Sequence, residues 1–298
     1  MQLIIPMTGQ GSRFVKAGFE RLKPFIPVHG KPLIEWVLKM FPGILPEKII
    51  FILQRHHYES MPYIQSILQE IAPLAKISLL DKYDTRGPVP NILHSSHLIN
   101  DHEPVFISYC DFYMRWDFIQ FNTFLHNENL DGAIPCYTDF HPHLISSPNF
   151  YACCKSDAKN NLIEVREKFS FTENKTQSMH SPGVYYFKNG ALLKKYFQTA
   201  MDLNLSTNGE FYCSLPFNLM VNDQLRVLVT KNVEYFCQWG TPEDLSQYLS
   251  WFEHLVGGKK TNGFHGVGRN TQASELHGFN KLTMQYWREF MTLEGIIK

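Results

Sequence analysis

The first third of the chain alternates short apolar runs with segments of helical apolar spacing. Buried strands are indicated at residues 3–5, 48–53, 75–80 and 105–109. Residues 32–38 begin with proline, which is favoured in the first turn of a helix, and residues 63–71 repeat apolar side chains at steps of three and four. Strands that alternate with helices predict a mostly parallel sheet covered by helices on both faces.

The middle of the chain shows a different pattern, because strand-like segments follow one another without helices between them. These segments are residues 132–138, 150–155, 162–167 and 184–187. They predict a small antiparallel extension mixed with the main sheet. Later strands are indicated at residues 227–230 and 235–237, followed by a helix at 243–256. The expected fold is therefore α/β and Rossmann-like, with a mixed, mainly parallel sheet flanked by helices, an antiparallel β extension and a C-terminal helical tail.

The last forty or so residues form a separate pattern. Residues 257–268 are rich in glycine and predict a flexible linker between a domain at 1–256 and a tail at 269–298. From Leu276 to Ile297, apolar residues recur at steps of three or four, which indicates one face of an amphipathic helix. The pattern leaves two interpretations open: the face docks on the core of its own chain, or it binds a partner such as a second copy.

Composition and charge narrow the class of protein. Lys plus Arg and Asp plus Glu both number 28, and this balance favours neither a nucleic-acid nor a membrane partner. We expect no secretion leader in residues 1–10, and no run approaches the roughly 20 apolar residues of a membrane span. The six cysteines contain no C-x-x-C pair, which is typical of reduced thiols in a cytoplasmic protein. We interpret His141-Pro142-His143 as a solvated loop rather than a zinc site, because neither cysteine nor helix accompanies it.

A glycine-rich turn directly follows the first strand. It reads Gly9-Gln10-Gly11-Ser12-Arg13-Phe14. Glycine lets the backbone approach a ligand, exposed N–H groups can hold phosphates, and Arg13 adds a positive fork for a polyphosphate. A dinucleotide-binding turn is disfavoured, because Phe14 stands where a third glycine is needed and a proline-bounded stretch follows.

The continuation at residues 22–34 makes the pattern specific. It contains Lys23-Pro24 and then Gly30-Lys31-Pro32. With it, the chain resembles the nucleotidyltransferases that make sugar nucleotides, which open with G-x-G-x-R and then K-P-x-x-x-V-x-G-K-P-x-I. The resemblance covers about residues 1–252 and is strongest to a capsule and lipopolysaccharide-type subgroup.

This resemblance implies a triphosphate site near the N-terminus. It assigns Arg13 and Lys23 to the triphosphate at the reacting phosphorus, where positive side chains stabilise charge on phosphoryl oxygens. The residues it implies for nucleotide binding are Gly9, Gln10, Gly11, Ser12 and Gly87. Gly87 lies in a base-recognition segment, in which Pro88 and its successors replace the family's usual small residues.

Asp111 is the implied metal ligand. It ends an apolar strand, and the carboxyl ends of parallel strands face the ligand crevice of such folds. One carboxylate can hold a triphosphate-bound Mg²⁺ ion, because phosphate oxygens complete its coordination. Asp117 is a weaker second candidate. Gln238 stands where many relatives have a metal-binding aspartate, two residues before the glycine of G-T-P-E-D-L, so no second carboxylate is expected there.

The acceptor site is implied by three later segments. Glu167 and Lys168 match an E-K pair whose glutamate accepts hydrogen bonds from substrate hydroxyls and whose lysine binds the substrate phosphate. Gly183 belongs to a G-x-Y-x-F strand. Glu210 belongs to an N-G-E-F-Y segment and is implied as a substrate or metal ligand.

The resemblance thus implies a Mg²⁺-dependent enzyme. A phosphorylated small molecule, typically a sugar 1-phosphate, would attack the α-phosphorus of a nucleoside triphosphate and release pyrophosphate, for surface polysaccharide precursors. A phosphate monoester is already anionic, so positioning and charge neutralisation suffice without a general base.

Two other functions compete with this one. A glycosyltransferase that uses a nucleotide sugar usually carries D-x-D at its metal, but Asp111 is followed by Phe112 and Tyr113. A catalytically silent nucleotide-binding regulatory module is supported by Gln238 and opposed by the presence of Arg13 and Lys23.

Overall fold

The computed structural model describes residues 1–146, 151–257 and 281–298. The predicted linker beyond Gly257 and the first part of the predicted tail, residues 269–280, lie outside the described residues.

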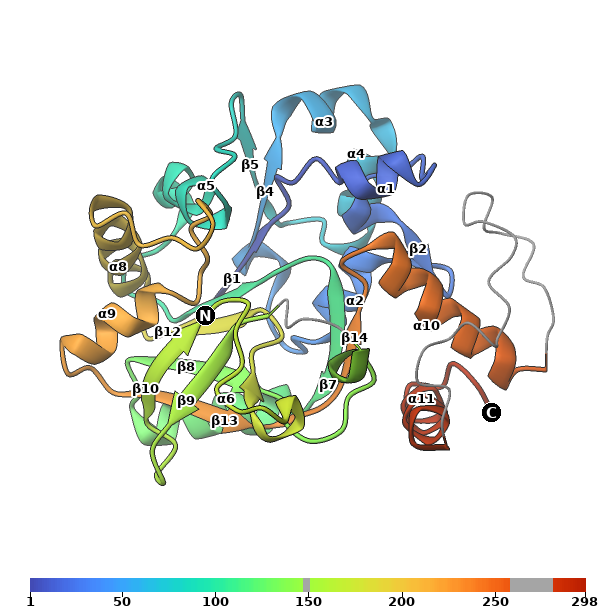
Figure 1. Cartoon of the computed structure of the whole chain (residues 1–298). Coiled ribbons are helices and arrows are strands. Elements are labelled where there is room, and N and C mark those ends of the chain that lie inside the picture. Colours follow the sequence, from blue (N-terminus) through green and yellow to red (C-terminus); the bar gives the residue numbers. More distant parts are fainter. Residues whose placement is uncertain (147–150, 258–280) are drawn as a thin grey trace.

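A seven-stranded sheet forms the centre of the molecule (Figure 1), in the order β13-β8-β12-β6-β1-β4-β5. Its strands are β1 Gln2–Pro6, β4 Ile49–Gln54, β5 Lys76–Leu80, β6 Val105–Ser108, β8 Gly132–Cys136, β12 Val184–Phe187 and β13 Val227–Lys231. Strand β12 runs antiparallel to both of its neighbours, and the other pairs are parallel. The predicted mixed, mainly parallel sheet is confirmed.

Helices cover both faces of this sheet. Within β1, Leu3 and Ile5 join one apolar cluster while Ile4 joins the other, because successive side chains of a strand point to opposite faces. The helices are α1 Ser12–Lys16, α2 Leu33–Lys39, α3 Arg55–Ser60, α4 Pro62–Ile71, α5 Pro88–His94, α6 Phe118–Glu128, α7 His143–Ser146, α8 Gly190–Asp202, α9 Pro216–Asn222, α10 Pro242–Leu255 and α11 Lys281–Leu293, with 3₁₀ turns η1 Lys23–Phe25, η2 Pro46–Lys48, η3 Ser96–Leu98 and η4 Lys175–Gln177. Helices α5, α8 and α9 contribute to one cluster, and α2, α4, α6, α10 and α11 to the other.

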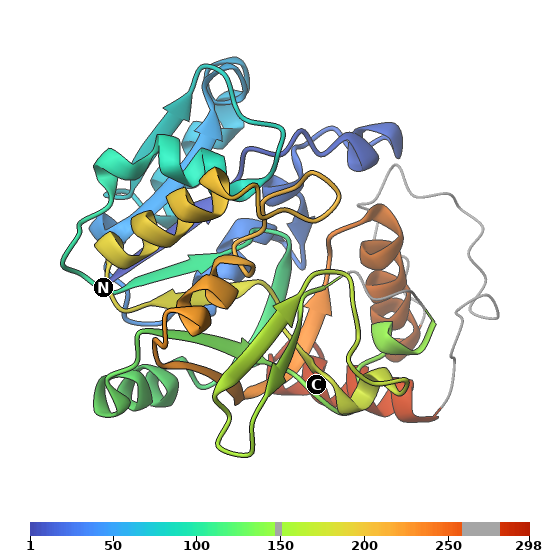
Figure 2. The same ribbon diagram turned by 60° about the vertical axis from the view of Figure 1, so that its left-hand side comes forward.

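Smaller sheets complete the β structure. Strands β9 Cys153–Ser156, β10 Leu162–Arg166 and β11 Met179–His180 form the predicted antiparallel extension, which projects from the main sheet in Figure 2. Two of the four segments predicted for it, 132–138 and 184–187, supply β8 and β12 of the main sheet instead. Strand β7 Phe112–Trp116 pairs with β14 Val233–Gln238, and β2 Pro27–Val28 pairs with β3 Lys31–Pro32.

Helix α11 docks on the core of its own chain. Its residues Tyr286, Trp287, Phe290 and Met291 are buried in the same apolar cluster as α2 and α10. The Tyr286 hydroxyl accepts from the backbone N–H of Phe236 at 2.8 Å and donates to its carbonyl at 3.2 Å. The first of the two interpretations of the tail is therefore the one seen in the structure.

The tail helix is shorter than the apolar pattern suggests. It ends at Leu293 and does not reach Ile297. Gly295 adopts φ 67°, a left-handed conformation that glycine permits and that commonly terminates helices.

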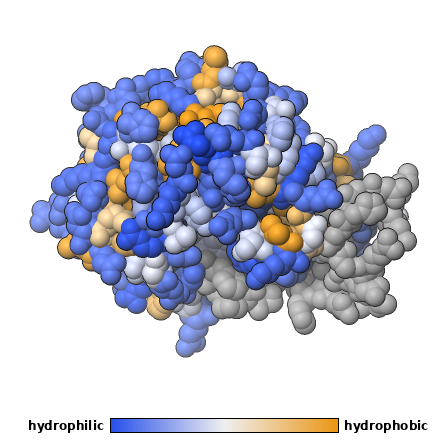
Figure 3. Space-filling view, turned by 90° about the horizontal axis from the view of Figure 1, so that it is seen from above, coloured by the Kyte–Doolittle hydropathy of each residue, from blue (hydrophilic) through white to orange (hydrophobic). Residues whose placement is uncertain are grey.

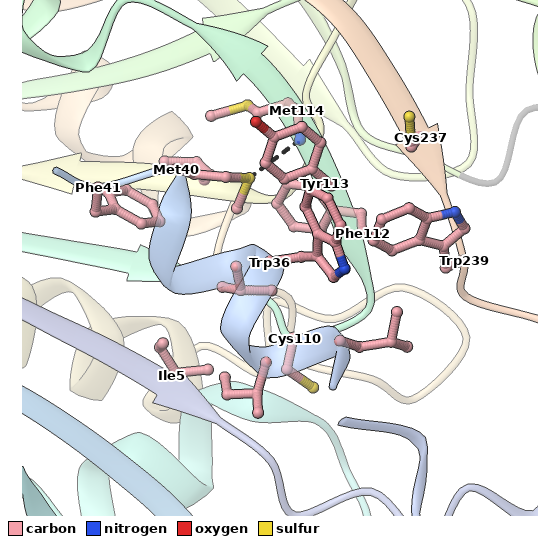
Figure 4. Packing of buried hydrophobic residues seen from close by; sticks show 14 of the residues in the cluster. Ile5, Trp36, Met40, Phe41, Cys110, Phe112, Tyr113, Met114, Cys237 and Trp239 are labelled. Carbon is pink, nitrogen blue, oxygen red and sulfur yellow. Dashed lines mark hydrogen bonds between the residues drawn. The ribbon is translucent and has the colours of Figure 1, made fainter. Parts of the chain in front are cut away.

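Aromatic packing around α2 fixes the strand that follows Asp111 (Figure 4). The Trp36 ring lies edge-on to that of Tyr113 at 5.3 Å, and Tyr113 stacks on Trp239 at 6.3 Å between centroids. The backbone N–H of Met114 points to the sulfur of Met40 at 3.1 Å. This contact set brings the start of β7 and the end of β14 together in space.

The interpretation of His141 and His143 as a solvated loop is wrong. His141 is only 3% exposed, and its ring lies 4.6 Å from Tyr137 and 5.3 Å from Tyr286, measured between centroids. His143 Nε2 shares a hydrogen bond with the Tyr137 hydroxyl at 2.9 Å. His141 packs against Tyr286 of the tail helix, whereas the His143 ring packs against Tyr137, Tyr151 and Phe236.

The surface gives no sign of an extended apolar face on the side viewed in Figure 3, where apolar residues form small separate groups among hydrophilic ones. Each helix in the described part of the chain is too short or too polar to cross a bilayer.

Candidate nucleotidyl-transfer site

A cavity of about 680 Å³ lies where β1 and β6 end. It is lined by Arg13, Tyr109, Asp111, Phe112, Tyr151, Ala152, Glu167, Lys168, Ser181, Pro182, Gly183, Tyr185, Glu210, Tyr212, Gln238, Gly240, Thr241, Glu243 and Asp244. The predicted residues Arg13, Asp111, Glu167, Lys168, Gly183 and Glu210 thus meet at one cavity, although they are spread over some two hundred positions. This location agrees with the expectation that ligands bind at the carboxyl ends of parallel strands.

The glycine-rich turn leads into the cavity from β1. Gly11 has φ 60° and precedes helix α1, on which Arg13 is exposed and reaches the cavity wall. Gly9, Gln10, Gly11 and Ser12 are outside the lining and form the backbone that carries Arg13. Their contact with nucleotide stays a prediction.

Lys23 lies outside the cavity lining but forms an ion pair with Asp111, which belongs to the lining. Lys23 begins η1, Asp111 lies between β6 and β7, and Lys23 Nζ donates to Asp111 Oδ2 at 2.8 Å. Burial acts to lower the pKa of Lys23, but the Asp111 carboxylate outweighs it and the pKa is raised above its usual value. Lys23 is therefore fully protonated at neutral pH, beside the proposed metal ligand.

Gly240 lies next to Asp111. A Cβ atom at position 240 would lie 3.2 Å from Asp111 Oδ2, a tight contact that a small shift of the carboxylate would have to relieve. The backbone N–H of Trp239 also donates to the Asp111 carbonyl at 3.1 Å. The closing G-T-P-E-D-L segment and the metal-ligand candidate are therefore direct neighbours.

Gln238 is engaged with a carboxylate that the sequence analysis did not single out. Its Nε2 donates to Asp244 Oδ2 at 2.6 Å, and the Thr241 hydroxyl donates to the same oxygen at 2.7 Å. Thr241 caps helix α10 by accepting from the Asp244 N–H at 3.1 Å. Burial raises the pKa of Asp244. In the sequence, the Thr-x-x-Asp spacing at the start of α10 was the one local signal that Thr241 and Asp244 interact.

The proposed acceptor residues belong to the same lining. Glu167 Oε1 accepts a hydrogen bond from the Ser214 hydroxyl, and burial raises the pKa of Glu167 to about 7. Lys168 has φ 55°, its N–H donates to the Tyr151 carbonyl at 3.0 Å, and its Nζ lies 3.9 Å from Glu210 Oε2.

Gly183 permits a close approach rather than supplying a functional group. It has φ 108°, and a Cβ atom there would lie 2.8 Å from the Tyr109 ring. Its carbonyl accepts from the Tyr109 N–H at 3.1 Å, which joins the start of β12 to the end of β6.

Four tyrosines in the lining were missed by sequence reasoning. They are Tyr109, Tyr151, Tyr185 and Tyr212. Tyr109 and Tyr185 meet edge-on at 5.9 Å between centroids. The predicted motifs contain or adjoin these four positions. Aromatic residues in strands usually indicate a buried core, so the sequence gave no separate signal that these tyrosines line the cavity.

Gly87 lies outside the cavity lining, at the start of α5. It has φ 112°, and a Cβ atom there would be 2.8 Å from the Phe211 carbonyl oxygen. The Phe211 N–H donates to the Arg86 carbonyl at 2.6 Å. The segment is thus packed on the residue after Glu210, and its role in base recognition stays a prediction.

Asp117 does not belong to the site. It is the N-cap of α6, where its Oδ1 accepts from the Gln120 N–H at 2.8 Å. Across the described ranges, no cluster of three or more His, Cys, Asp or Glu side chains is arranged to hold a metal ion. Asp111, the predicted metal ligand, lines the cavity, and its binding of Mg²⁺ together with substrate phosphates stays a prediction.

The mixed, mainly parallel sheet and the cavity at its carboxyl edge define a Rossmann-like α/β protein. The chain belongs to the nucleotidyl transferase family, whose model matches residues 3–248.

Relatives and solved structures are consistent with this assignment. The chain is 25% identical over 257 residues, 86% of its length and 57% of the relative's, to a bifunctional sugar-1-phosphate nucleotidylyltransferase/acetyltransferase of Sulfurisphaera tokodaii. It is 21% identical, over 82% of its own length and 52% of the relative's, to the bifunctional protein GlmU of Methanocaldococcus jannaschii. The chain therefore spans about half the length of the curated relatives it matches.

Two solved structures share the fold. A nucleoside-diphosphate-sugar pyrophosphorylase from Vibrio cholerae RC9 aligns with TM-score 0.63 at 17% identity, over 84% of this chain and all of that one. A UDP-glucose pyrophosphorylase complexed with UDP-glucose aligns with TM-score 0.61 at 14% identity, over 82% and 94%. At these identities the likeness concerns the fold alone.

Proposed function

We propose that the protein transfers a nucleotidyl group from a nucleoside triphosphate to the phosphate of a small molecule and releases pyrophosphate. A sugar 1-phosphate is the first acceptor to test, since the relative from Sulfurisphaera tokodaii is named for that substrate. The observation that carries the proposal is that Arg13 lines one cavity together with Asp111, whose carboxylate is ion-paired with Lys23. The resemblance to capsule-type enzymes suggests that the product serves surface polysaccharide synthesis.

The chemistry follows from the charges in the cavity. An oxygen of the acceptor phosphate attacks the α-phosphorus, the bond from that phosphorus to the bridging oxygen breaks, and pyrophosphate leaves. Arg13 and Lys23 would bind the phosphoryl oxygens on which negative charge increases, and Lys168 would hold the acceptor phosphate. Asp111 would hold Mg²⁺, which neutralises charge on the triphosphate when bound.

Pyrophosphate release over a matrix of nucleoside triphosphates and sugar phosphates tests this proposal. With the best pair, Arg13→Ala and Lys23→Ala should each lower turnover about 100-fold or more, since loss of one oriented donor at a reacting oxyanion has that effect. Lys16→Ala is the matched control, because Lys16 is exposed on the same short helix and outside the cavity lining.

Near-normal turnover of both variants would show that the triphosphate is bound elsewhere. Nucleotide binding without pyrophosphate release for every pair would indicate a regulatory module instead.

A further inference from the structure

The part of the cavity lined by Glu167, Lys168 and Glu210 carries more negative than positive charge. Glu167 and Glu210 line it, against the single cation Lys168, while Arg13 lies at the triphosphate end beside Lys23 and Asp111. Lys168 is proposed above to bind the acceptor phosphate. Its charge is then balanced by that phosphate, so Glu167 and Glu210 face the rest of the acceptor without this cation to balance their own charges.

Glu167 is the more poorly compensated of the two carboxylates. Burial dominates its environment, its described hydrogen bond comes from the neutral hydroxyl of Ser214, and the influences of Lys168 and Glu210 oppose each other. A carboxylate removed from water is costly unless a cation or several donors compensate it. A bound cation would supply that compensation.

The aromatic side chains point to the same kind of ligand. Tyr109, Tyr151, Tyr185 and Tyr212 line this cavity with Glu167. Cations are attracted to the faces of such rings, and Lys168 Nζ already lies 5.4 Å from the centroid of Tyr212. The carboxylates and the face of Tyr212 together favour an ammonium group over a second anionic group.

We infer that the acceptor carries an ammonium group in addition to its phosphate, and that Glu167 recognises this group. The inference rests on the proposed function and narrows its substrate class to phosphate esters that bear an amine, such as amino-sugar or amino-alcohol phosphates. Glu210 borders the same space from the 207–212 segment, where its carboxylate also accepts from the Tyr212 hydroxyl.

Matched acceptors that differ only in one group provide the test. Pyrophosphate release is measured with glucosamine 1-phosphate against glucose 1-phosphate, and with ethanolamine phosphate against 2-hydroxyethyl phosphate. The ammonium member of at least one pair should have kcat/KM about tenfold higher or more, because hydrogen bonds between charged partners are roughly twice as strong as neutral ones. The two pairs distinguish a sugar from a short amino-alcohol framework.

Two variants assign the preference to Glu167. Glu167→Gln keeps the shape and removes the charge, so the ratio of ammonium to hydroxyl acceptor should fall toward one. Glu164→Gln is the matched control on strand β10, where Glu164 pairs with Arg166 outside the cavity lining, and it should leave the ratio unchanged.

Equal rates within both pairs, or a preference for the hydroxyl members, would overturn the inference and leave nucleotidyl transfer standing. If no acceptor releases pyrophosphate, the proposed function fails, and calorimetric binding of the same four compounds to the wild-type protein still decides the preference. A Glu167→Gln protein that does not fold leaves the wild-type ratios to decide.

Discussion

Replacement of Glu294 should weaken the docking of the tail helix on the core and lower the stability of the protein. This residue directly follows α11, and its side chain is only 3% exposed. It accepts from Lys39 Nζ at 2.6 Å, from the Tyr113 hydroxyl at 2.8 Å and from the Arg115 guanidinium at 3.0 Å. Glu294→Ala removes all three contacts at once.

The cost follows from the exposure of the partners. A hydrogen bond to a charged group contributes about 1.5–3 kcal/mol, but the Lys39 and Arg115 side chains are 48% and 35% exposed and regain water in the variant. We therefore expect a loss of about 2–4 kcal/mol rather than the sum of three contacts. For a chain of this size that is a fall in Tm of roughly 3–6 °C.

The same network predicts a pH dependence. Burial acts to raise the pKa of Glu294, but the hydrogen bonds from Lys39, Tyr113 and Arg115 outweigh it and lower the pKa below its usual 4.5. A lowered pKa in the folded state means that the contribution to stability is present above about pH 4.5 and is lost as the pH falls below it. The Tm difference between the wild type and Glu294→Gln should therefore become smaller as the pH falls.

Calorimetric or fluorescence melting from pH 7 down to 4 measures both effects. Glu289→Gln is the control, because Glu289 lies on the same helix with its carboxylate exposed and bonded to Tyr235 and Gln285, and its Tm should stay close to that of the wild type. If Glu294→Ala melts with the wild type, the docking of α11 does not depend on this network and the reasoning is refuted.

Three further outcomes are expected. Asp111→Asn should fold normally but lose Mg²⁺-dependent turnover. Lys23→Met frees the Asp111 carboxylate, so this variant should bind Mg²⁺ more tightly than the wild type in nucleotide-free titration calorimetry. Unchanged affinity would contradict the idea that Lys23 and Mg²⁺ share the Asp111 carboxylate. Gly87→Ala should destabilise by about 1–3 kcal/mol in denaturant unfolding, because φ is positive and the new Cβ would press on Phe211; an unaltered midpoint would refute that strain. Deletion of residues 257–298 should give an insoluble or unfolded protein, because it uncovers the apolar surface under α11. The burial of four side chains of α11 is lost, and each contributes about 1.5–3 kcal/mol to the free energy of unfolding. A soluble, active truncation would show the tail to be an accessory.

Local features of the sequence predicted the fold and much of the site. Apolar runs such as residues 48–53 are short and continuous because both faces of the parallel sheet are covered, so they indicate strands without tertiary information. The glycine-rich turn, the Lys23 motif and the acid at the end of β6 are contiguous patterns, and the rule that ligands meet strand carboxyl ends places Arg13 and Asp111 together.

The tertiary structure alone decided which residues that are distant in the chain become side-chain neighbours. An acidic residue such as Asp117 can cap a helix or bind a metal, and its position at the start of α6 rather than at the cavity settles which. The apolar face of the tail fits its own core or a partner equally well, and the ring of aromatic residues from β7, β14 and α10 determines that it packs on its own core. Tyr109 and Tyr185 show the same limit. A periodic pattern indicates that a ring is buried, but only the antiparallel pairing of β6 with β12 places these two rings in the wall of the cavity.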